Sequence, residues 1–266
     1  MIQFAGDSDL SALKRIWKQG FGDSDDTIAS FFDGAKGLYR CLCYLDGETP
    51  IATMYIFECD FCIDGKKHKC AYLYALSTLP EYRGRGIMGD LLSYACEKLK
   101  TYGYEYVALA PAKQSLISYY ERFGFLPSCM AKTADIPCDS IFDFATETEY
   151  LTPDRLAQMR DSRGGSFVSF SSEYVRFALD FCDAAAISFD GGYAVCVPDD
   201  NLTRVIEYDG EINRVLSAVK YKFESESYRV FMPFNSLLGE PVCRGMIKSL
   251  CGADIQQNAH IGLIMD

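Results

Sequence analysis

The sequence predicts an α/β (α+β) protein in which a sheet is flanked by helices, followed by a second, smaller domain of similar element order. Apolar strand patterns separated by turns precede a glycine-rich turn that opens a helix, and one further apolar strand follows that helix. A comparable order of helices and strands recurs in the second half. The length of 266 residues exceeds the usual size of one domain, about 100 to 150 residues, so two domains are expected.

Composition limits the classes of function. Hydrophobic residues make up 49% and charged residues 24%, as in ordinary soluble globular proteins. A net charge of -11 argues against general binding to nucleic acids or to anionic membranes. The N-terminus lacks the pattern of a signal peptide, and no apolar run approaches the roughly 20 residues that span a bilayer. We therefore expect a cytoplasmic protein without nucleic-acid or membrane partners.

The first half begins with helices and an antiparallel meander. A helix cap at Asp7-Ser8-Asp9 precedes apolar residues at helical spacing from Leu10 to Phe21, and a second helix is expected from Asp26 to Asp33. The strands that follow are Leu38 to Leu45, Ile51 to Cys62 and His68 to Thr78. Turns with Gly47 and Gly65 connect them as antiparallel neighbours.

A basic glycine turn follows the meander and opens a helix from Ile87 to Tyr102. Its glycines, Gly84, Gly86 and Gly89, let the backbone approach a bulky polyphosphate. The free N–H groups and the positive dipole end of the new helix favour negative charge. Arg83 and Arg85 add full positive charges to that field. The turn therefore predicts a site for a phosphorylated ligand.

The first half closes with a strand, a helix and a strand. Glu105 to Ala110 is almost uninterruptedly apolar, which predicts a strand buried on both faces. A helix from Ser115 to Phe123 ends at Gly124, and a strand region surrounds Phe125 to Ile136. Residues 137–152 are expected to link the domains.

The second half repeats the element order without repeating residue identity. Helices are expected at Pro153 to Arg160, Ser171 to Cys182, Glu211 to Phe223 and Val242 to Leu250. Strands are expected in a hairpin across Gly191-Gly192 and at Arg204 to Tyr208, Tyr228 to Pro233 and His260 to Met265. Where the first half has its glycine turn, the second has Tyr208-Asp209-Gly210-Glu211, whose two acids should repel a pyrophosphate.

Other phosphate sites fit the glycine turn less well. Gly84-x-Gly86-x-x-Gly89 satisfies the dinucleotide-binding pattern. In that fold, however, a strand of a parallel unit runs straight into the first glycine, whereas Pro80 to Arg83 intervene here after an antiparallel meander. The G-x-x-x-x-G-K-[ST] loop of nucleotide triphosphatases does not occur. A turn that only tightens the chain is a further alternative, and the flanking arginines weigh against it.

Metal and nucleophile chemistry has little support. The twelve cysteines are scattered, mostly in apolar segments, which favours reduced core thiols. Cys59-x-x-Cys62 has the spacing of a zinc or redox pair, but it lies in a predicted strand and has no second pair. Of the two histidines, His68 is expected in solvent and His260 in the last strand. A hydrolase is not favoured, and no metal is expected.

Two motifs together resemble a known family. Pro80 to Met88, after a strand, is similar to the acetyl-coenzyme-A motif of the Gcn5-related N-acetyltransferases (GNAT), Q/R-x-x-G-x-G/A. Arg83 and Gly86 fill its first two fixed positions, whereas Met88 stands where glycine or alanine is usual. Tyr119-Tyr-Glu-Arg-Phe-Gly-Phe125 resembles the later Y-E-x-x-G-F signature. The resemblance covers residues 1–136 and looks closest to the two-domain branch of the enhanced-intracellular-survival (Eis) acetyltransferases.

The resemblance implies a mixed sheet in which two parallel strands splay and hold the pantetheine arm of coenzyme A between them. It implies an acetyl-CoA-binding catalytic domain at 1–136, a linker at 137–152 and a degenerate GNAT-like domain at 153–266. The implied cofactor-binding residues are Leu76, Ser77, Thr78, Arg83, Gly84, Arg85, Gly86, Ile87, Met88 and Gly89.

The resemblance also implies the reaction. Acetyl passes from acetyl-coenzyme A to a primary amine by direct attack, through a tetrahedral intermediate that backbone N–H near Thr78 stabilises. Tyr120 aligns with the tyrosine that protonates the departing sulfur, since a phenol with pKa about 10 is protonated at neutral pH. Tyr119 is the neighbouring candidate. Adjacent helix positions point about 100° apart, so one of the two tyrosines should face the thioester.

Several assignments stay open. Candidate bases are Glu58, with Asp60 on the same strand face, and the C-terminal carboxylate of Asp266, which related two-domain enzymes use. Met88 and the lack of an obvious base favour a rival function, a non-catalytic coenzyme-A-binding or protein-interaction module. The acceptor is a small-molecule or peptide amine, and an oligomer is possible.

Overall fold

The computed structural model describes residues 1–144, 147–255 and 258–265. Contacts divide the chain into two compact units: unit 1, Met1–Ser128 with Gly245–Gln256, and unit 2, Cys129–Arg244 with Gln257–Asp266. This division differs from the expected boundaries at 136 and 153. The chain leaves unit 1 earlier and returns to it at Gly245. A local pattern cannot reveal such a return, because it depends on pairing between distant strands.

Unit 1 contains the predicted helices and the predicted antiparallel meander. Its first elements are β1 (Ile2–Phe4), α1 (Leu10–Phe21), α2 (Asp25–Gly34), β2 (Tyr39–Asp46), β3 (Thr49–Ile63) and β4 (Lys66–Thr78). The next are α3 (Ile87–Thr101), β5 (Tyr106–Leu109) and α4 (Ile117–Glu121). All but β1 correspond to elements that the sequence predicts.

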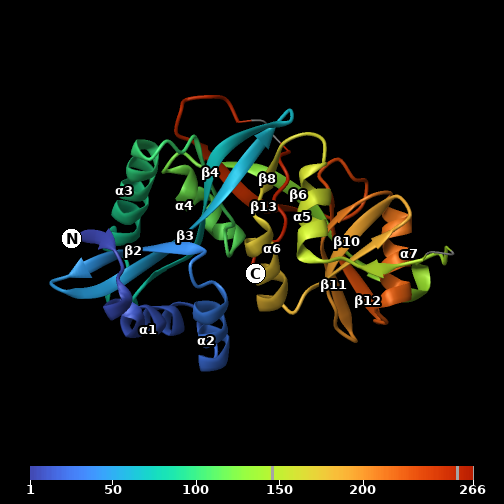
Figure 1. The fold of residues 1–266 in the computed structure, drawn as a ribbon, viewed down its shortest axis with the longest axis horizontal. Coiled ribbons are helices and arrows are strands. Elements are labelled where there is room, and N and C mark those ends of the chain that lie inside the picture. The colour runs from blue at the N-terminus through green and yellow to red at the C-terminus, as the bar shows by residue number, and fades with distance from the viewer. Residues whose placement is uncertain (145–146, 256–257, 266) are drawn as a thin grey trace. The chain divides into compact units, whose positions relative to one another are not determined.

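The sheet of unit 1 has the order β1-β2-β3-β4-β5-β13. Within it β4 and β5 are parallel, and the other neighbours are antiparallel, so the predicted mixed sheet is confirmed. The last strand, β13 (Glu240–Ser249), pairs with β5 from Met246 to Ser249. Figure 1 shows α1 and α2 on one side of the meander and α3 on the other. Every residue of β5 is buried, as its composition predicts.

An aromatic cluster holds α1 and α2 on this sheet. The Trp17 ring centroid lies 4.3 Å from that of Phe31 and 5.4 Å from that of Tyr55. All three side chains are buried. Because aromatic rings bury large apolar areas, the cluster fixes both helices against the strands that lead to the glycine turn.

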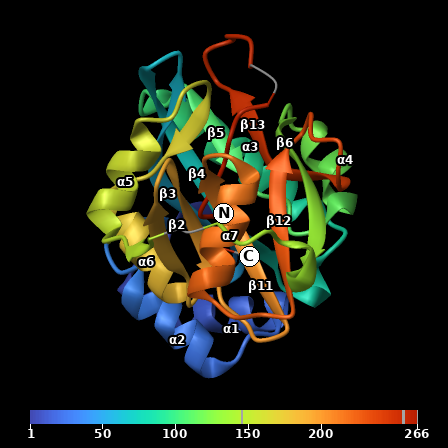
Figure 2. The ribbon, with the colours of Figure 1, turned by 90° about the vertical axis from the view of Figure 1, so that its right-hand side faces the viewer.

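The strands of unit 2 are neighbours in the order β6-β12-β11-β10-β9-β7. Its strands are β6 (Leu126–Pro137), β7 (Glu149–Tyr150), β8 (Phe167–Ser169), β9 (Ala185–Phe189), β10 (Gly192–Val197), β11 (Leu202–Asp209) and β12 (Ser227–Pro233). Its helices are α5 (Pro153–Asp161), α6 (Ser172–Phe181) and α7 (Ile212–Lys222). The predicted hairpin is confirmed as β9 and β10. β11 and β12 are parallel, and α7, which connects them, lies across the sheet in Figure 2.

Two elements predicted for the second half are wrong. Residues 242–250 form most of β13 and not a helix, because pairing with β5 overrides the local pattern. The described residues 258–265 form no strand, and His260 makes only an isolated parallel bridge to Phe167.

Three side-chain expectations have clear outcomes. His68 is not in solvent: its side chain is largely buried, with Nδ1 2.9 Å from Glu105 Oε2. Cys59 is buried in β3, where burial and the thiol of Cys70 raise its pKa, whereas a redox-active cysteine needs a lowered pKa. In the part of the chain that the structure describes, no three His, Cys, Asp or Glu side chains are placed to hold a metal ion.

Among the residues with a described structure, no helix is long and apolar enough to cross a bilayer.

Candidate active site

The parallel strands β4 and β5 pair over a short distance and then diverge. Their register runs from Cys70↔Tyr106 to Leu73↔Leu109. β5 ends at Leu109, whereas β4 continues to Thr78. The last part of β4 therefore has no parallel partner within this register, which leaves an edge along which an extended ligand can bind.

A bulge interrupts β4 at the start of that edge. Tyr74 pairs with Tyr55 and Ser77 pairs with Thr53, so β4 has one residue more than β3 in this interval. Ala75 within the bulge has φ 48°, which is unusual for a residue other than glycine. Strained backbone of this kind concentrates at functional sites.

A cavity of about 1110 Å³ opens where the two strands separate. Its wall comes from the end of β4, the glycine turn with the start of α3, the segment from 112 to 123, and the end of α1. The first two contribute Leu76, Ser77, Thr78, Tyr82, Arg83, Gly84, Gly86, Ile87, Met88, Gly89, Asp90 and Ser93. The last two contribute Ala112, Lys113, Leu116, Tyr119, Tyr120, Arg122, Phe123, Gly20 and Phe21. Nine of the ten predicted cofactor-binding residues lie in this wall, the exception being Arg85.

The glycines of the turn serve different purposes. Gly84 and Gly86 have φ 76° and 80°, and no atom lies within 4 Å of a Cβ placed on either. Gly86 is the N-cap of α3 and makes no side-chain cap, so the first N–H groups of α3 lack an intrahelical partner and remain available to a ligand. Gly89 instead lets α3 approach Phe123 closely.

The two arginines of the turn differ. Arg83 lines the cavity, and its Nε donates to the carbonyl oxygen of Thr78 at 3.0 Å, which ties the turn to the end of β4. Arg85 folds back on its own turn, where Nη2 donates to the carbonyl oxygen of Glu81 and the guanidinium lies over the Tyr82 ring. The sequence could not separate these two roles.

Both candidate tyrosines, Tyr119 and Tyr120, line the cavity. Their ring centroids are 5.4 Å apart. Burial, and secondarily the neighbouring Tyr119, raises the pKa of Tyr120 to about 12. The Tyr120 phenol therefore keeps its proton at neutral pH, as an acid must.

Of the three candidate bases, neither Glu58 nor Asp60 lines the cavity. Glu58 of β3 is exposed, does not line the cavity, and accepts a hydrogen bond from Tyr104 Oη at 2.6 Å. Asp60 lies 3.8 Å from Lys67 Nζ. Asp266 lies outside the described residues.

Two cations of the wall, Lys113 and Arg122, were not predicted from the sequence. Both lie beside segments that it had singled out, Ala112 and the Tyr119 to Phe125 signature, so position in a motif was the available signal. The described wall thus contains three cations, counting Arg83, and one carboxylate, that of Asp90. The described wall is therefore net positive in a chain of net charge -11, which suits an anionic ligand.

The family model described as an acetyltransferase (GNAT) domain matches residues 1–127. The matched residues contain the diverging strands and the glycine turn, so this part of the chain carries a GNAT acetyltransferase domain. No protein of curated function matches the sequence.

Solved structures share the fold over most of the chain. A conserved protein of unknown function from Enterococcus faecalis has TM-score 0.77 at 10% identity, covering 94% of this chain and 73% of that one. A GCN5-related N-acetyltransferase from Anabaena variabilis has TM-score 0.74 at 16% identity, covering 94% and 73%. Eis1 from Mycobacterium abscessus has TM-score 0.72 at 14% identity, covering 94% and 74%. At these identities the likeness establishes the fold.

The residues of the cavity fit coenzyme A, the cofactor that the resemblance to the GNAT family implies. The open space above Gly84 and Gly86, the uncapped start of α3 and the guanidinium of Arg83 suit a diphosphate. The unpaired end of β4 suits the amides of an extended pantetheine arm.

Proposed function

We propose that the chain transfers an acetyl group from acetyl-coenzyme A directly to a primary amine, without a covalent enzyme intermediate and without a metal. The observation that carries the proposal is the net positive cavity between the diverging strands β4 and β5, with a protonated Tyr120 in its wall. When bound, acetyl-coenzyme A supplies the acetyl group as a thioester.

The chain's own residues then have separate tasks. The glycine turn and Arg83 bind phosphate, and the bulged end of β4, from Leu76 to Thr78, presents backbone N–H where negative charge develops. The Tyr120 phenol holds the proton that a departing thiolate takes. Asp266 remains the proposed base that accepts the proton of the amine, since Glu58 does not line the cavity. The acceptor is proposed to be a small-molecule or peptide amine.

Unit 2 is proposed to be a degenerate GNAT-like domain that does not bind coenzyme A. Its support is the start of α7, where the Glu211 carboxylate accepts from the backbone N–H of Asn213 and Arg214. The corresponding N–H groups of α3 are left for a ligand. We further propose a cytoplasmic location, for which the chain's high content of cysteines without a paired pattern is the support.

Thiol release from acetyl-coenzyme A across a panel of primary amines tests the proposal, with coenzyme A binding measured by calorimetry. Wild type should turn over at least one amine, and Tyr120→Phe should lose turnover while keeping cofactor affinity. Tyr119→Phe is the matched control, because it removes the adjacent wall hydroxyl. Cofactor binding without turnover on any amine would favour the non-catalytic coenzyme-A-binding module. Absence of coenzyme A binding would contradict both the acetyltransferase and that module.

A further inference from the structure

A second cavity, of about 490 Å³, lies entirely within unit 2. β11 and β12 pair in parallel from Leu202↔Ser227 to Val205↔Val230 and then stop pairing. The cavity opens beyond that point, with Ile206 to Asp209 on one side and Phe231 to Pro233 on the other. It therefore occupies the position in this sheet that the candidate cofactor cavity occupies between β4 and β5.

Coenzyme A does not suit this second cavity. The N–H groups at the start of α7 are already bonded to Glu211, whose negative charge also repels a diphosphate. The Arg244 guanidinium lies 3.8 Å from the Phe231 ring centroid, and its Nη2 donates to the carbonyl oxygen of Ile206. It thus spans the diverging strands where a pantetheine arm would lie, so a ligand here must be smaller.

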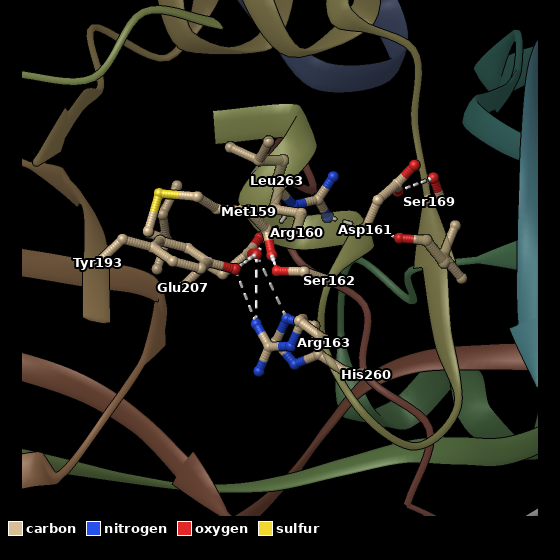
Figure 3. A network of polar contacts seen from close by, with 12 residues as sticks. Met159, Arg160, Asp161, Ser162, Arg163, Ser169, Tyr193, Glu207, His260 and Leu263 are labelled. Atoms are coloured by element: carbon tan, nitrogen blue, oxygen red, sulfur yellow. Dashed lines mark hydrogen bonds and ion pairs between the residues drawn. The ribbon is translucent and has the colours of Figure 1, made fainter. Parts of the chain in front are cut away.

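A buried ion cluster forms one wall. Glu207 Oε1 accepts from Arg160 Nε at 2.8 Å and from Tyr193 Oη at 2.7 Å, and Arg163 Nη1 approaches it at 3.4 Å (Figure 3). Glu207 and Arg160 are buried. Two guanidinium groups therefore share one carboxylate, which leaves one positive charge uncompensated among the three groups. In a low-dielectric interior such a charge attracts an anion.

Arg163 is the member of this cluster that a ligand can reach. It lines the cavity, and its side chain is 15% exposed, against 2% for Arg160. Its Nη1 is engaged by Tyr193 and Glu207, whereas Nε and Nη2 make no hydrogen bond to any residue that the structure describes. A guanidinium has five N–H donors in a fork that matches a carboxylate.

Further groups beside Arg163 favour the same ligand. His260 Nε2 is buried, lies 3.7 Å from Glu207 Oε1 and has no hydrogen-bond partner among the described residues. Glu207 Oε2 also has no hydrogen-bond partner among the described residues. This oxygen packs against Gly262, so closely that a side chain at position 262 would collide with it. The other wall carboxylate, Asp209, is exposed. The apolar part of the wall includes Ile206, Phe231, Met232 and Ile261.

We propose that this cavity is a second ligand site, for a small organic monocarboxylate whose carboxylate is bound by Arg163 and whose apolar body packs on Phe231 and Ile261. Its volume lies within the range of small-molecule sites, about 300 to 1000 Å³. The site is distinct from the acetyl-transfer site of unit 1 and does not depend on the function proposed there.

Fluorine NMR with 4-fluorophenylacetate tests the site, with 2-(4-fluorophenyl)ethanol as the neutral comparison. Coenzyme A is added to saturation so that the cations of unit 1 are covered. The acid should bind and the alcohol should not. Arg163→Met should weaken binding about tenfold or more, and Arg163→Lys should restore part of it. Arg214→Met is the matched control, because Arg214 is an exposed arginine of the same unit, paired with Asp190.

The location is tested without any variant. In a crystal of the wild-type chain soaked with 4-bromophenylacetate, the anomalous signal of bromine should lie between Phe231 and Ile261. Bromine found beside Arg83, equal binding of acid and alcohol, or no binding of either would each overturn the proposal. Arg83→Met separates the two sites, since it should weaken coenzyme A binding and leave 4-fluorophenylacetate binding unchanged.

Discussion

Gly89, in the first turn of α3, lies against the ring of Phe123, so that a Cβ at position 89 would be 2.8 Å from Phe123 Cζ. Phe123 belongs to the second GNAT-like motif and Gly89 directly follows the first, and both line the candidate cofactor cavity. The contact therefore connects the two motifs: the segment that carries Tyr119 and Tyr120 packs against α3, the helix that follows the glycine turn.

Gly89→Ala should destabilise the fold by about 1 to 3 kcal/mol, because an added methyl group overpacks this contact. Urea unfolding measures the change. Gly6→Ala is the control, since the nearest atom to a Cβ there is Ser8 Oγ at 3.9 Å and φ is -103°. It should stay within about 0.5 kcal/mol of wild type. Equal stability of the two variants would show that Phe123 moves away at little cost.

Arg83→Met should weaken coenzyme A binding about tenfold, because Arg83 lines the cavity and offers a charged donor to phosphate. Arg85→Met should change the affinity far less, since Arg85 lies on the Tyr82 ring and bonds to its own turn. Titration calorimetry at fixed ionic strength compares the pair. A larger loss for Arg85 would mean that the turn rearranges when the cofactor binds.

The pH dependence of turnover should show no basic limb from Tyr120 between pH 8 and 10. Burial raises the pKa of this phenol to about 12, and an acid acts in its protonated form, which persists below the pKa. Activity that depends on Tyr120 is thus present below about pH 12 and lost above it. The profile of kcat with saturating amine is the measurement. An inflection near pH 9 in wild type that is absent from Tyr120→Phe would contradict the raised pKa.

Glu207→Gln should destabilise unit 2 by about 3 to 5 kcal/mol, because it leaves the buried guanidinium of Arg160 and the partly buried one of Arg163 without their carboxylate. Burial alone would raise the pKa of Glu207, but the charges of Arg160 and Arg163 with the contact to His260 lower it well below its usual value. A lowered folded pKa gives stability that is present above the unfolded pKa of about 4.3 and lost as the pH falls through the folded pKa.

Acid unfolding followed by circular dichroism should therefore be shallower in Glu207→Gln than in wild type below about pH 4. Asp190→Asn is the control, since Asp190 forms an exposed ion pair with Arg214 and such pairs contribute about 0 to 1 kcal/mol. If Glu207→Gln kept the acid slope of wild type, the carboxylate would not be the group whose protonation unfolds unit 2.

Elements that depend on adjacent residues were predictable from the sequence, whereas elements that depend on pairing between distant strands were not. The strand, glycine turn and helix from 66 to 101 were predictable, because φ > 0 at Gly84 and Gly86 and the helical periodicity after Ile87 are properties of adjacent residues. The helix expected at 242–250 was wrong, because its apolar residues suit a strand equally well and pairing with β5 decided between them.

Side-chain roles in the candidate site divide in the same way. Tyr120 was identified from a motif, and its place in the cavity wall followed from the helix that carries it. Arg83 and Arg85 were indistinguishable, because which of them faces the cavity depends on contacts with Thr78 and Tyr82.

The amino-acid sequence alone determined the family-like motifs and the order of elements from α1 to α4, and it predicted an anionic ligand at residues 83 to 89. Tertiary structure decided the return of β13 to β5, the second cavity and the ion cluster of Arg160, Arg163 and Glu207. The physical reason is distance along the chain: backbone preferences act between neighbours, whereas Arg160 and Glu207 are 47 positions apart and meet only after their helix and strand have packed.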